Sequence, residues 1–286
     1  MKTTKTWFIT GASKGIGFEL VKQALAGGDN VIAASRNIKS LKIAFNIAPT
    51  QFLPVEMDIA NEQSVRNAVA IAIKQFGKID CLVNNAGYGL LGGIEESSDE
   101  EARANFDINV FGLLNVTRVV LPYMREAGSG HIFNMSSVFG LVAGAAWGIY
   151  CASKFAVEGL SEALEQEMKP FGINVTIVEP GYFRTGFLDS GSVKTPAKPI
   201  GDYSELTEIK RKHLFDIPGQ QIGDPVKAAT VIWQISRLDN PPVRLLLGSD
   251  AVAYAQQKTE SLQKGITDNI KISASTDYLS EALTHI

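Results

Sequence analysis

The stretch Thr6–Gly17, TWFITGASKGIG, decides the fold of this 286-residue chain. It begins with an apolar run as long as a buried strand and ends in three glycines, directly before an amphipathic segment. A glycine-rich turn between a strand and a helix lets the backbone approach a pyrophosphate, which the N–H groups at the helix start can bind. A plain turn is the alternative, but the place after a first strand favours a phosphate site. The residues predicted to form it are Gly11, Ser13, Lys14, Gly15, Ile16 and Gly17.

Short apolar runs alternate with longer amphipathic ones along the rest of the chain. Most of the short runs are nearly continuous Val, Ile, Leu and Phe, as in strands covered on both faces. Strand–helix–strand repetition predicts a doubly wound α/β fold, here a Rossmann fold with a parallel seven-stranded sheet. The predicted strands are 6–10, 30–35, 51–56, 79–84, 131–136, 174–179 and 243–247.

Helices are predicted at 15–26, 61–76, 150–169 and 225–238. Asn61 is a plausible N-cap of the second and Gly77 its C-terminal stop. Ser98 and Glu101 fit a capping box that opens a further helix toward Arg125. A proline in a helix interior breaks the hydrogen-bond ladder, so Pro122 is expected to bend that helix or end it early.

Residues 1–250 are predicted to form one domain, because no linker or repeat interrupts them. Residues 182–223 contain Gly, Pro, Lys, Ser and aromatic residues without a clear strand, and a long irregular insertion of this kind is often a lid. Residues 251–286 form a C-terminal extension of the same domain, predicted to be helical over 251–262 and polar beyond.

Composition excludes several partners. Lys and Arg number 27 against 30 Asp and Glu, and no basic stripe indicates nucleic acid or an anionic membrane. The apolar runs are too short for a signal peptide or a membrane span, which predicts a cytoplasmic protein. Cys81 and Cys151 lie in apolar surroundings and are interpreted as buried free thiols rather than a disulfide, and no metal site is predicted.

The end of the second strand indicates the dinucleotide. A site for NAD places Asp or Glu there to bind the ribose 2′-hydroxyl, whereas this chain has Ser35, Arg36 and Asn37. A guanidinium can bind a 2′-phosphate through two parallel hydrogen bonds, and Lys14 would add a second cation. NADP(H) is therefore the predicted cofactor, and two solvated surface cations are the alternative.

Tyr150 and Lys154 are four residues apart on a predicted helix, so their side chains share one face. An adjacent ammonium is expected to lower the pKa of the phenol and so make it an acid–base group near neutral pH. Ser137 follows a predicted strand at its carboxyl end, where ligands of open α/β sheets bind, and its hydroxyl could orient a substrate oxygen.

Together these motifs resemble the short-chain dehydrogenase/reductase superfamily of single-domain type, over roughly residues 5–250. The motifs that carry the resemblance are the glycine turn Thr10–Gly17, Asp58-Ile59, Asn84-Asn85-Ala86-Gly87, Asn109, Ser137, Tyr150-x-x-x-Lys154, and Pro180-Gly181 with Thr185. Each has an ordinary structural alternative: Asp58 and Ser137 could be caps, Asn84 and Asn85 turn formers, and Asn109 a group that satisfies the backbone at a helix kink.

The resemblance implies a role for each motif. Tyr150 would be the catalytic acid/base, Lys154 would bind the nicotinamide ribose, Ser137 would hold the substrate carbonyl, and Asn109 would support a water beside Lys154. The cofactor contacts implied elsewhere are Ser35 and Arg36, Asp58 and Ile59, Asn85, Ala86 and Gly87, and Pro180, Gly181, Phe183 and Thr185. Family members commonly form dimers or tetramers, so a homodimer or homotetramer is expected.

The predicted reaction is the reversible, NADPH-dependent reduction of a ketone or aldehyde to an alcohol. An apolar substrate is expected because the candidate pocket residues are mostly apolar. They are Tyr88, Leu90, Leu91, Leu141, Val142, Trp147, Tyr182, Phe183, Phe187 and Phe215, with Arg184 as a possible carboxylate partner. The alternatives are a non-catalytic NADP(H)-binding sensor and a nucleotide-sugar epimerase or dehydratase, although the chain has little room for the larger substrate domain of the latter.

Overall fold

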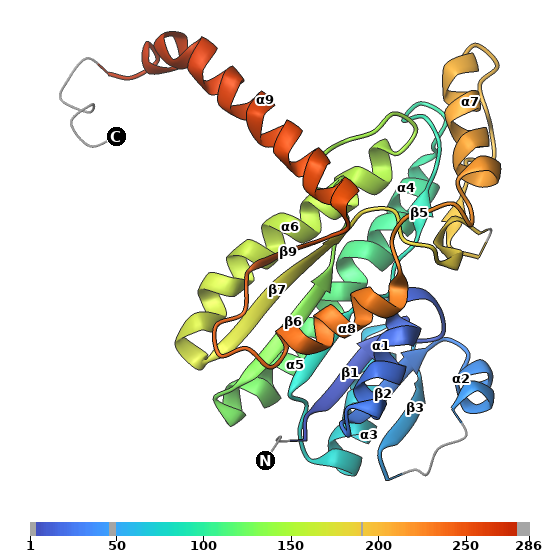
Figure 1. The fold of residues 1–286 in the computed structure, drawn as a ribbon, viewed down its shortest axis with the longest axis vertical. Helices are drawn as coiled ribbons and strands as arrows, with labels where there is room; N and C mark the ends of the chain where they lie inside the picture. The colour runs from blue at the N-terminus through green and yellow to red at the C-terminus, as the bar shows by residue number, and fades with distance from the viewer. Residues whose placement is uncertain (1–3, 46–49, 190, 279–286) are drawn as a thin grey trace.

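The computed structural model describes residues 4–45, 50–189 and 191–278. In this part of the chain seven parallel strands form one sheet, in the order β3-β2-β1-β4-β6-β7-β9 (Figure 1). This is the strand order of a doubly wound Rossmann fold, so the predicted fold class is confirmed. The strands are β1 (Thr6–Thr10), β2 (Asn30–Ser35), β3 (Phe52–Glu56), β4 (Cys81–Asn84), β6 (Gly130–Met135), β7 (Ile173–Pro180) and β9 (Arg244–Leu247).

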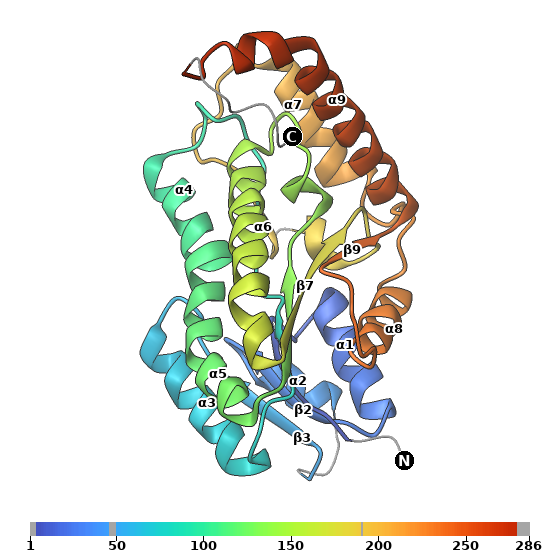
Figure 2. The same cartoon turned by 90° about the vertical axis from the view of Figure 1, so that its left-hand side faces the viewer.

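Helices cover both faces of the sheet. On one face, α1 (Gly15–Ala26), α2 (Lys39–Ala44) and α8 (Pro225–Ile235) pack over Trp7 and Ile9 of β1. On the other face, α3 (Glu62–Phe76), α5 (Leu113–Ala127) and α6 (Gly148–Met168) pack over Phe8. Successive strand side chains point to opposite faces, so the continuous apolar runs supply two cores. Figure 2 shows α6 beside α5 and the helix that precedes it, α4 (Asp99–Phe106), with α1 and α8 on the opposite face of the sheet.

Local signals set several helix ends as predicted. Asn61 caps α3 by accepting a hydrogen bond from the Ser64 backbone N–H, and Gly77 ends it in the left-handed conformation. Ser98 and Glu101 form the capping box of α4 (Asp99–Phe106). A π-helical segment, η1 (Asp107–Gly112), then joins α4 to α5.

Pro122 was expected to bend its helix or to end it early. It does not end the helix, because α5 continues to Ala127. One backbone hydrogen bond is lost at a proline. The buried side chains of Val119, Val120 and Met124 on either side of Pro122 hold the helix on the sheet, which offsets that loss.

The lid segment contains more regular structure than predicted. It holds a two-residue strand, β8 (Val193–Lys194), paired with β5 (Gly89–Leu90), followed by α7 (Ser204–Arg211) and the π-helical η5 (Lys212–Asp216). The short 3-10 helices are η2 (Val138–Gly140), η3 (Lys169–Phe171) and η4 (Gly186–Leu188). Such short elements carry too little periodicity to be predicted.

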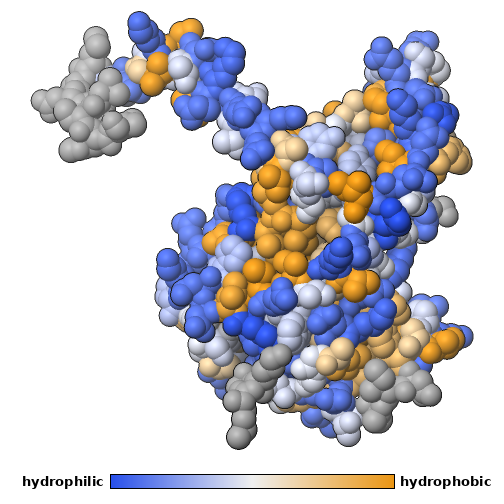
Figure 3. Space-filling model, viewed as in Figure 1, coloured by the Kyte–Doolittle hydropathy of each residue, from blue (hydrophilic) through white to orange (hydrophobic). Residues whose placement is uncertain are grey.

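The C-terminal helix α9 (Ser249–Ala274) extends past residue 262, where the prediction stopped, and projects from the body (Figure 1). Residues 279–286 of the predicted extension lie outside the described residues. Figure 3 shows apolar surface gathered in the middle of one face, below the root of α9, while the projecting α7 and α9 are mainly polar.

Both cysteines are buried free thiols, as predicted. Among the described residues no helix is both long and apolar enough to span a membrane.

Candidate active site

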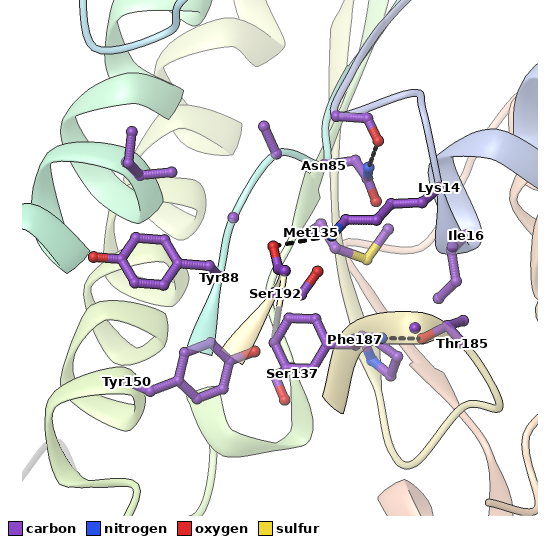
Figure 4. A pocket seen from close by; sticks show the side chains of 18 of the residues that line it. Lys14, Ile16, Asn85, Tyr88, Met135, Ser137, Tyr150, Thr185, Phe187 and Ser192 are labelled. Carbon is purple, nitrogen blue, oxygen red and sulfur yellow. Dashed lines mark hydrogen bonds between the residues drawn. The ribbon is translucent and has the colours of Figure 1, made fainter. Parts of the chain in front are cut away.

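A cleft of about 550 Å³ runs across the carboxyl ends of the strands. It lies where the strand order reverses, between β1 and β4. Ligands of doubly wound sheets bind at this switch point. The glycine turn and β2 line one end of the cleft, and η2, α6 and the lid line the other (Figure 4). Nearly every predicted site residue lines it, namely Gly11, Ser13, Lys14, Gly15, Ile16, Ser35, Arg36, Asp58, Ile59, Asn85, Ala86, Gly87, Ser137, Tyr150, Lys154, Pro180, Gly181, Phe183 and Thr185.

The glycine turn has the backbone that a phosphate cradle requires. Gly11 and Gly15 have φ near +62° and +61°, in the left-handed region that favours glycine. Gly17 does not line the cleft; it packs under the turn, where a Cβ would lie 2.4 Å from Asn85 Nδ2. The Asn85 amide in turn donates to the carbonyls of Thr10 and Gly11 at 3.0 and 3.1 Å. These residues fit a dinucleotide pyrophosphate, because the absent side chains leave the helix start open to it.

Asn84 and Asn85 act differently from simple turn formers. Asn84 is buried and donates to Thr117 and Asn134, which ties β4 to α5 and β6. Asn85 holds the glycine turn, as described above. Asn84 therefore ties β4 to its neighbours, and Asn85 joins the end of β4 to the glycine turn at the cleft.

The end of the cleft formed by the glycine turn and β2 carries a cation, Arg36, and no carboxylate directly after β2. Arg36 follows β2, is exposed, and makes no ion pair with any described residue. Asp58 does not cap α3; its carboxylate accepts a hydrogen bond from the Ala60 N–H at 3.0 Å, while Asn61 caps the helix. The surface at this end therefore has the charge that a 2′-phosphate would need.

Lys14 was predicted to face the 2′-phosphate, and in the structure its ammonium donates to the Gly191 carbonyl at 3.0 Å. Thr185 also approaches the turn, because a Cβ on Gly15 would lie 3.7 Å from Thr185 Cβ. The lid thus touches the glycine turn at two points. Lys14 still lines the cleft, so its charge remains near the phosphate site.

A buried carboxylate that the sequence analysis missed anchors the lid. Glu96 is 4% exposed, accepts hydrogen bonds from the backbone of Gly93 and Ile200, and pairs with Lys210 of α7 at 2.8 Å. Its partners are 3 to 114 residues away in the chain, so no local pattern could identify it. Glu96 therefore fixes the lid relative to the β5 loop.

Tyr150, Ser137 and Lys154 meet on the substrate side of the cleft. Tyr150 lies in the first turn of α6, and Ser137 lies beside its hydroxyl on the loop after β6 (Figure 4). The Lys154 ammonium lies 5.7 Å from the centre of the Tyr150 ring and donates to the Met135 carbonyl at 2.7 Å. Ser137 also caps η2 by accepting from the Phe139 N–H. The predicted juxtaposition across 13 residues is present.

The expected lowering of the Tyr150 pKa is not found. Tyr150 is 5% exposed, and burial raises the pKa of its phenol although the Ser137 hydrogen bond lowers it. Burial also lowers the pKa of Lys154 to about 8, although the negative charge of Glu158 acts to raise it. Burying a charge is costly, and that cost is the largest effect on the pKa of this phenol. The phenol is therefore protonated at neutral pH and can act as a proton donor.

Asn109 lies in η1, the π-helical segment, and does not line the cleft. Its amide accepts from the Tyr88 N–H and donates to the Tyr88 carbonyl, both at 3.0 Å, and also donates to Ser153. A Cβ on Gly87 would lie 3.0 Å from Asn109 Oδ1 and 3.7 Å from Lys154 Nζ. Asn109 thus satisfies the backbone of Tyr88, as the alternative predicted, and Gly87 lies between its side chain and the Lys154 ammonium.

Aromatic side chains surround Tyr150. The rings of Phe139, Trp147 and Phe187 lie 6.4, 5.5 and 5.9 Å from it. Of the predicted pocket residues, Tyr88, Trp147, Tyr182, Phe183 and Phe187 line the cleft.

The other predicted pocket residues do not line the cleft. Leu90 and Leu91 are buried, Leu91 in a core cluster beneath the site. Phe215 is 74% exposed. Leu141 and Val142 are partly buried elsewhere, and the Arg184 guanidinium donates to the Gln221 carbonyl.

The sequence analysis missed cleft residues that carry no motif: Ala34, Met57, Ala60, Ala104, Asp107, Ile108, Met135, Ser136, Val138, Phe139, Gly186, Leu188, Gly191, Ser192, Lys194 and Gln221. Phe139 could have been found, since it is two residues from Ser137 in the same loop. Ser192, Lys194 and Gln221 arrive through the fold of the lid, which no periodicity predicts.

The family model described as short chain dehydrogenase matches residues 5–194. The oxidoreductase BOA17 of Botryotinia fuckeliana is 36% identical over 91% of this chain and 94% of its own length. The 3-ketodihydrosphingosine reductase of Bacteroides thetaiotaomicron is 38% identical over 88% of this chain and 91% of its own.

Solved structures agree with these relatives. A short-chain dehydrogenase from Streptomyces avermitilis has a TM-score of 0.90 and 36% identity, covering 96% of this chain and 100% of its own. One from Burkholderia phymatum, in complex with NAD, has a TM-score of 0.78 and 25% identity over 97% and 98% of the two chains. ElxO with NADP bound has a TM-score of 0.73 and 25% identity over 88% and 100%. Such neighbours thus bind either nucleotide.

Proposed function

The chain belongs to the short-chain dehydrogenase family of oxidoreductases, and we propose that it reduces the carbonyl of an apolar ketone or aldehyde with NADPH. The observation that carries the proposal is the cleft itself. At one end it has an exposed arginine with no neighbouring carboxylate at the strand end, and at the other a protonated tyrosine beside a serine hydroxyl.

The residues at the glycine-turn end support NADP(H) as the cofactor. Gly11 and Gly15 leave the start of α1 open to a pyrophosphate, and Arg36 and Lys14 offer two cations to a 2′-phosphate. When bound, the nicotinamide would supply the hydride. Lys154, Pro180 and Thr185 would hold its end of the cofactor, and Asp58 the adenine end.

The chemistry of this chain is the movement of one proton. Ser137 donates a hydrogen bond to the substrate carbonyl oxygen and so favours the charge that develops there. The Tyr150 hydroxyl gives its proton to that oxygen, which becomes the hydroxyl of the alcohol, and the tyrosine becomes a phenolate. The Lys154 ammonium stabilises this phenolate while the proton is replaced, with Asn109 behind it.

The substrate side favours an apolar molecule. Phe139, Trp147 and Phe187 pack around Tyr150, so the carbonyl end of a substrate would meet aromatic carbon on several sides. Apolar pockets with a few convergent polar groups bind apolar ligands and fix their orientation. Arg184 offers no carboxylate site, because its guanidinium is bonded to the Gln221 carbonyl.

The test is NADPH consumption over a panel of ketones and aldehydes graded by size and polarity, with Tyr150→Phe as the control. Turnover that favours apolar members and is lost in the variant supports the proposal. NADPH binding with no consumption over the panel contradicts it and favours the alternative of a non-catalytic sensor. We keep a homodimer or homotetramer, and a cytoplasmic location, as predictions.

A further inference from the structure

A group of charged side chains lies next to Lys154 without lining the cleft. Glu158 of α6 and Glu179 of β7 are 5% and 0% exposed, and both pair with Arg244 of β9. The Arg244–Glu158 pair is 2.7 Å long. Arg244 also pairs with Glu162, which is 51% exposed at the surface. The group therefore extends from the surface, at Glu162, to buried side chains on and beside the helix that carries Tyr150.

Three carboxyl groups share one guanidinium, so their negative charges are not all neutralised by Arg244. Glu158 and Glu179 pair with the same nitrogen of Arg244, and two carboxylates this close in a buried place cannot both ionise freely. Burial and the charge of Glu158 raise the pKa of Glu179 to about 7, although Arg244 lowers it. Glu179, the fully buried member, is therefore the carboxyl group whose protonated form burial favours, while Glu158 is ion-paired with Arg244 at 2.7 Å.

Glu158 lies one helical turn from Lys154, on the same face of α6. The Lys154 ammonium also contacts the Met135 carbonyl and the Tyr150 ring, which are uncharged. Among the described residues, Glu158 is the charged side chain whose field opposes the effect of burial on the pKa of Lys154. Its carboxylate is therefore the counter-charge of this lysine.

The free oxygen of Glu158 faces the loop that forms the cleft. Glu158 Oε1 and Ser136 Oγ are both buried without a hydrogen-bond partner among the described residues. Gly140 separates them: a Cβ there would lie 2.4 Å from Ser136 Oγ and 2.7 Å from Glu158 Oε1. Ser136 lines the cleft, so one oxygen of Glu158 lies behind the wall of the cleft while Arg244 holds the other oxygen.

We propose that Glu158 is a positioning residue for the reaction, whose carboxylate, held by Arg244 and Glu179, keeps the Lys154 ammonium charged beside Tyr150. This inference rests on the proposed function, in which the ammonium stabilises the tyrosine phenolate. Without the carboxylate the lysine would release its proton at a lower pH, and reduction would fail there.

The first test is the pH dependence of kcat for carbonyl reduction in Glu158→Gln, with Glu162→Gln as the matched control. Glu162 lies one turn further along α6 and shares Arg244, but it is exposed. We expect the alkaline limb of the Glu158→Gln profile to move down by about one pH unit, a tenfold change in the charged fraction at a given pH. The limb of Glu162→Gln should stay in place. A loss of thermal stability in Glu158→Gln without a shift of its limb contradicts the proposal.

A second measurement does not depend on catalysis. The Lys154 side chain can be titrated by NMR in protein labelled with 13C at the lysine ε-carbons, with Lys154→Arg to assign the signal. The midpoint should fall by about one unit in Glu158→Gln and stay within a few tenths in Glu158→Asp, which keeps the charge. If Glu158→Gln does not fold, Glu158→Leu, which removes the charge and the buried polar atoms together, should lower the midpoint as well. An unchanged midpoint overturns the inference, even where the wild-type protein reduces carbonyls.

Discussion

Replacing Arg36 with aspartate tests the proposed choice of NADP(H) over NAD(H). Arg36 is exposed, so each of its two charge-assisted hydrogen bonds to a 2′-phosphate is worth the lower end of the usual range, about 1.5 kcal/mol. Together they give about 3 kcal/mol, which corresponds to a ~10²-fold weaker affinity for NADPH when the arginine is removed. An aspartate would also repel the phosphate while accepting a hydrogen bond from the 2′-hydroxyl of NADH.

The assay is the Kd of NADPH and of NADH, measured by the change in nicotinamide fluorescence on binding. Wild type should prefer NADPH, and Arg36→Asp should reduce the NADPH/NADH affinity ratio by at least ~10²-fold. Lys39→Asp is the matched control, because it makes the same charge change at an exposed position outside the cleft. Equal affinities in wild type would refute the assignment, and so would an equal loss in the control, which would indicate only a long-range effect of net charge.

Three further outcomes follow from the geometry. Gly17→Ala should weaken NADPH binding about tenfold, measured by fluorescence, since its Cβ would lie 2.4 Å from Asn85 Nδ2 and displace the side chain that holds the glycine turn. Reduction should slow as the pH rises through about 8, because burial lowers the pKa of Lys154 to about 8 and the lysine loses its positive charge above that pH. A kcat that stays constant from pH 7 to 10 would contradict this prediction. Glu96→Gln should raise KM more than it lowers kcat, with a thermal midpoint lower by a few degrees, since Lys210 and the lid lose their buried counter-charge; unchanged steady-state kinetics would contradict it.

The sequence predicted the sheet well because its signals are local. Each strand is a continuous apolar run, and the first and second strands have the bounds predicted for them. Asn61, Gly77 and the capping box at Ser98 act within one turn of the helix ends they define. Pro122 misled because the packing of its neighbours, which the sequence does not display, outweighed one lost hydrogen bond.

The same distinction between local and long-range signals applies to the site. The glycine turn and the Tyr150–Lys154 pair depend on fixed spacings and could be predicted. The contacts of Lys14 with Gly191 and of Glu96 with Lys210 join residues more than 100 positions apart, and nothing local marks them. The pKa of Tyr150 had the wrong predicted direction because burial, a property of the whole fold, acts more strongly on it than its neighbour does.

The most direct measurement of the central claim is the rate of NADPH oxidation by a reducible ketone in Tyr150→Phe, together with the Kd of NADPH in the same variant. Removal of a general acid should lower the rate at least ~10²-fold. The Kd should stay within about twofold, because the ring and its packing against Trp147 and Phe187 are retained. A variant that binds NADPH normally and still reduces the ketone at a rate near that of wild type would contradict the account.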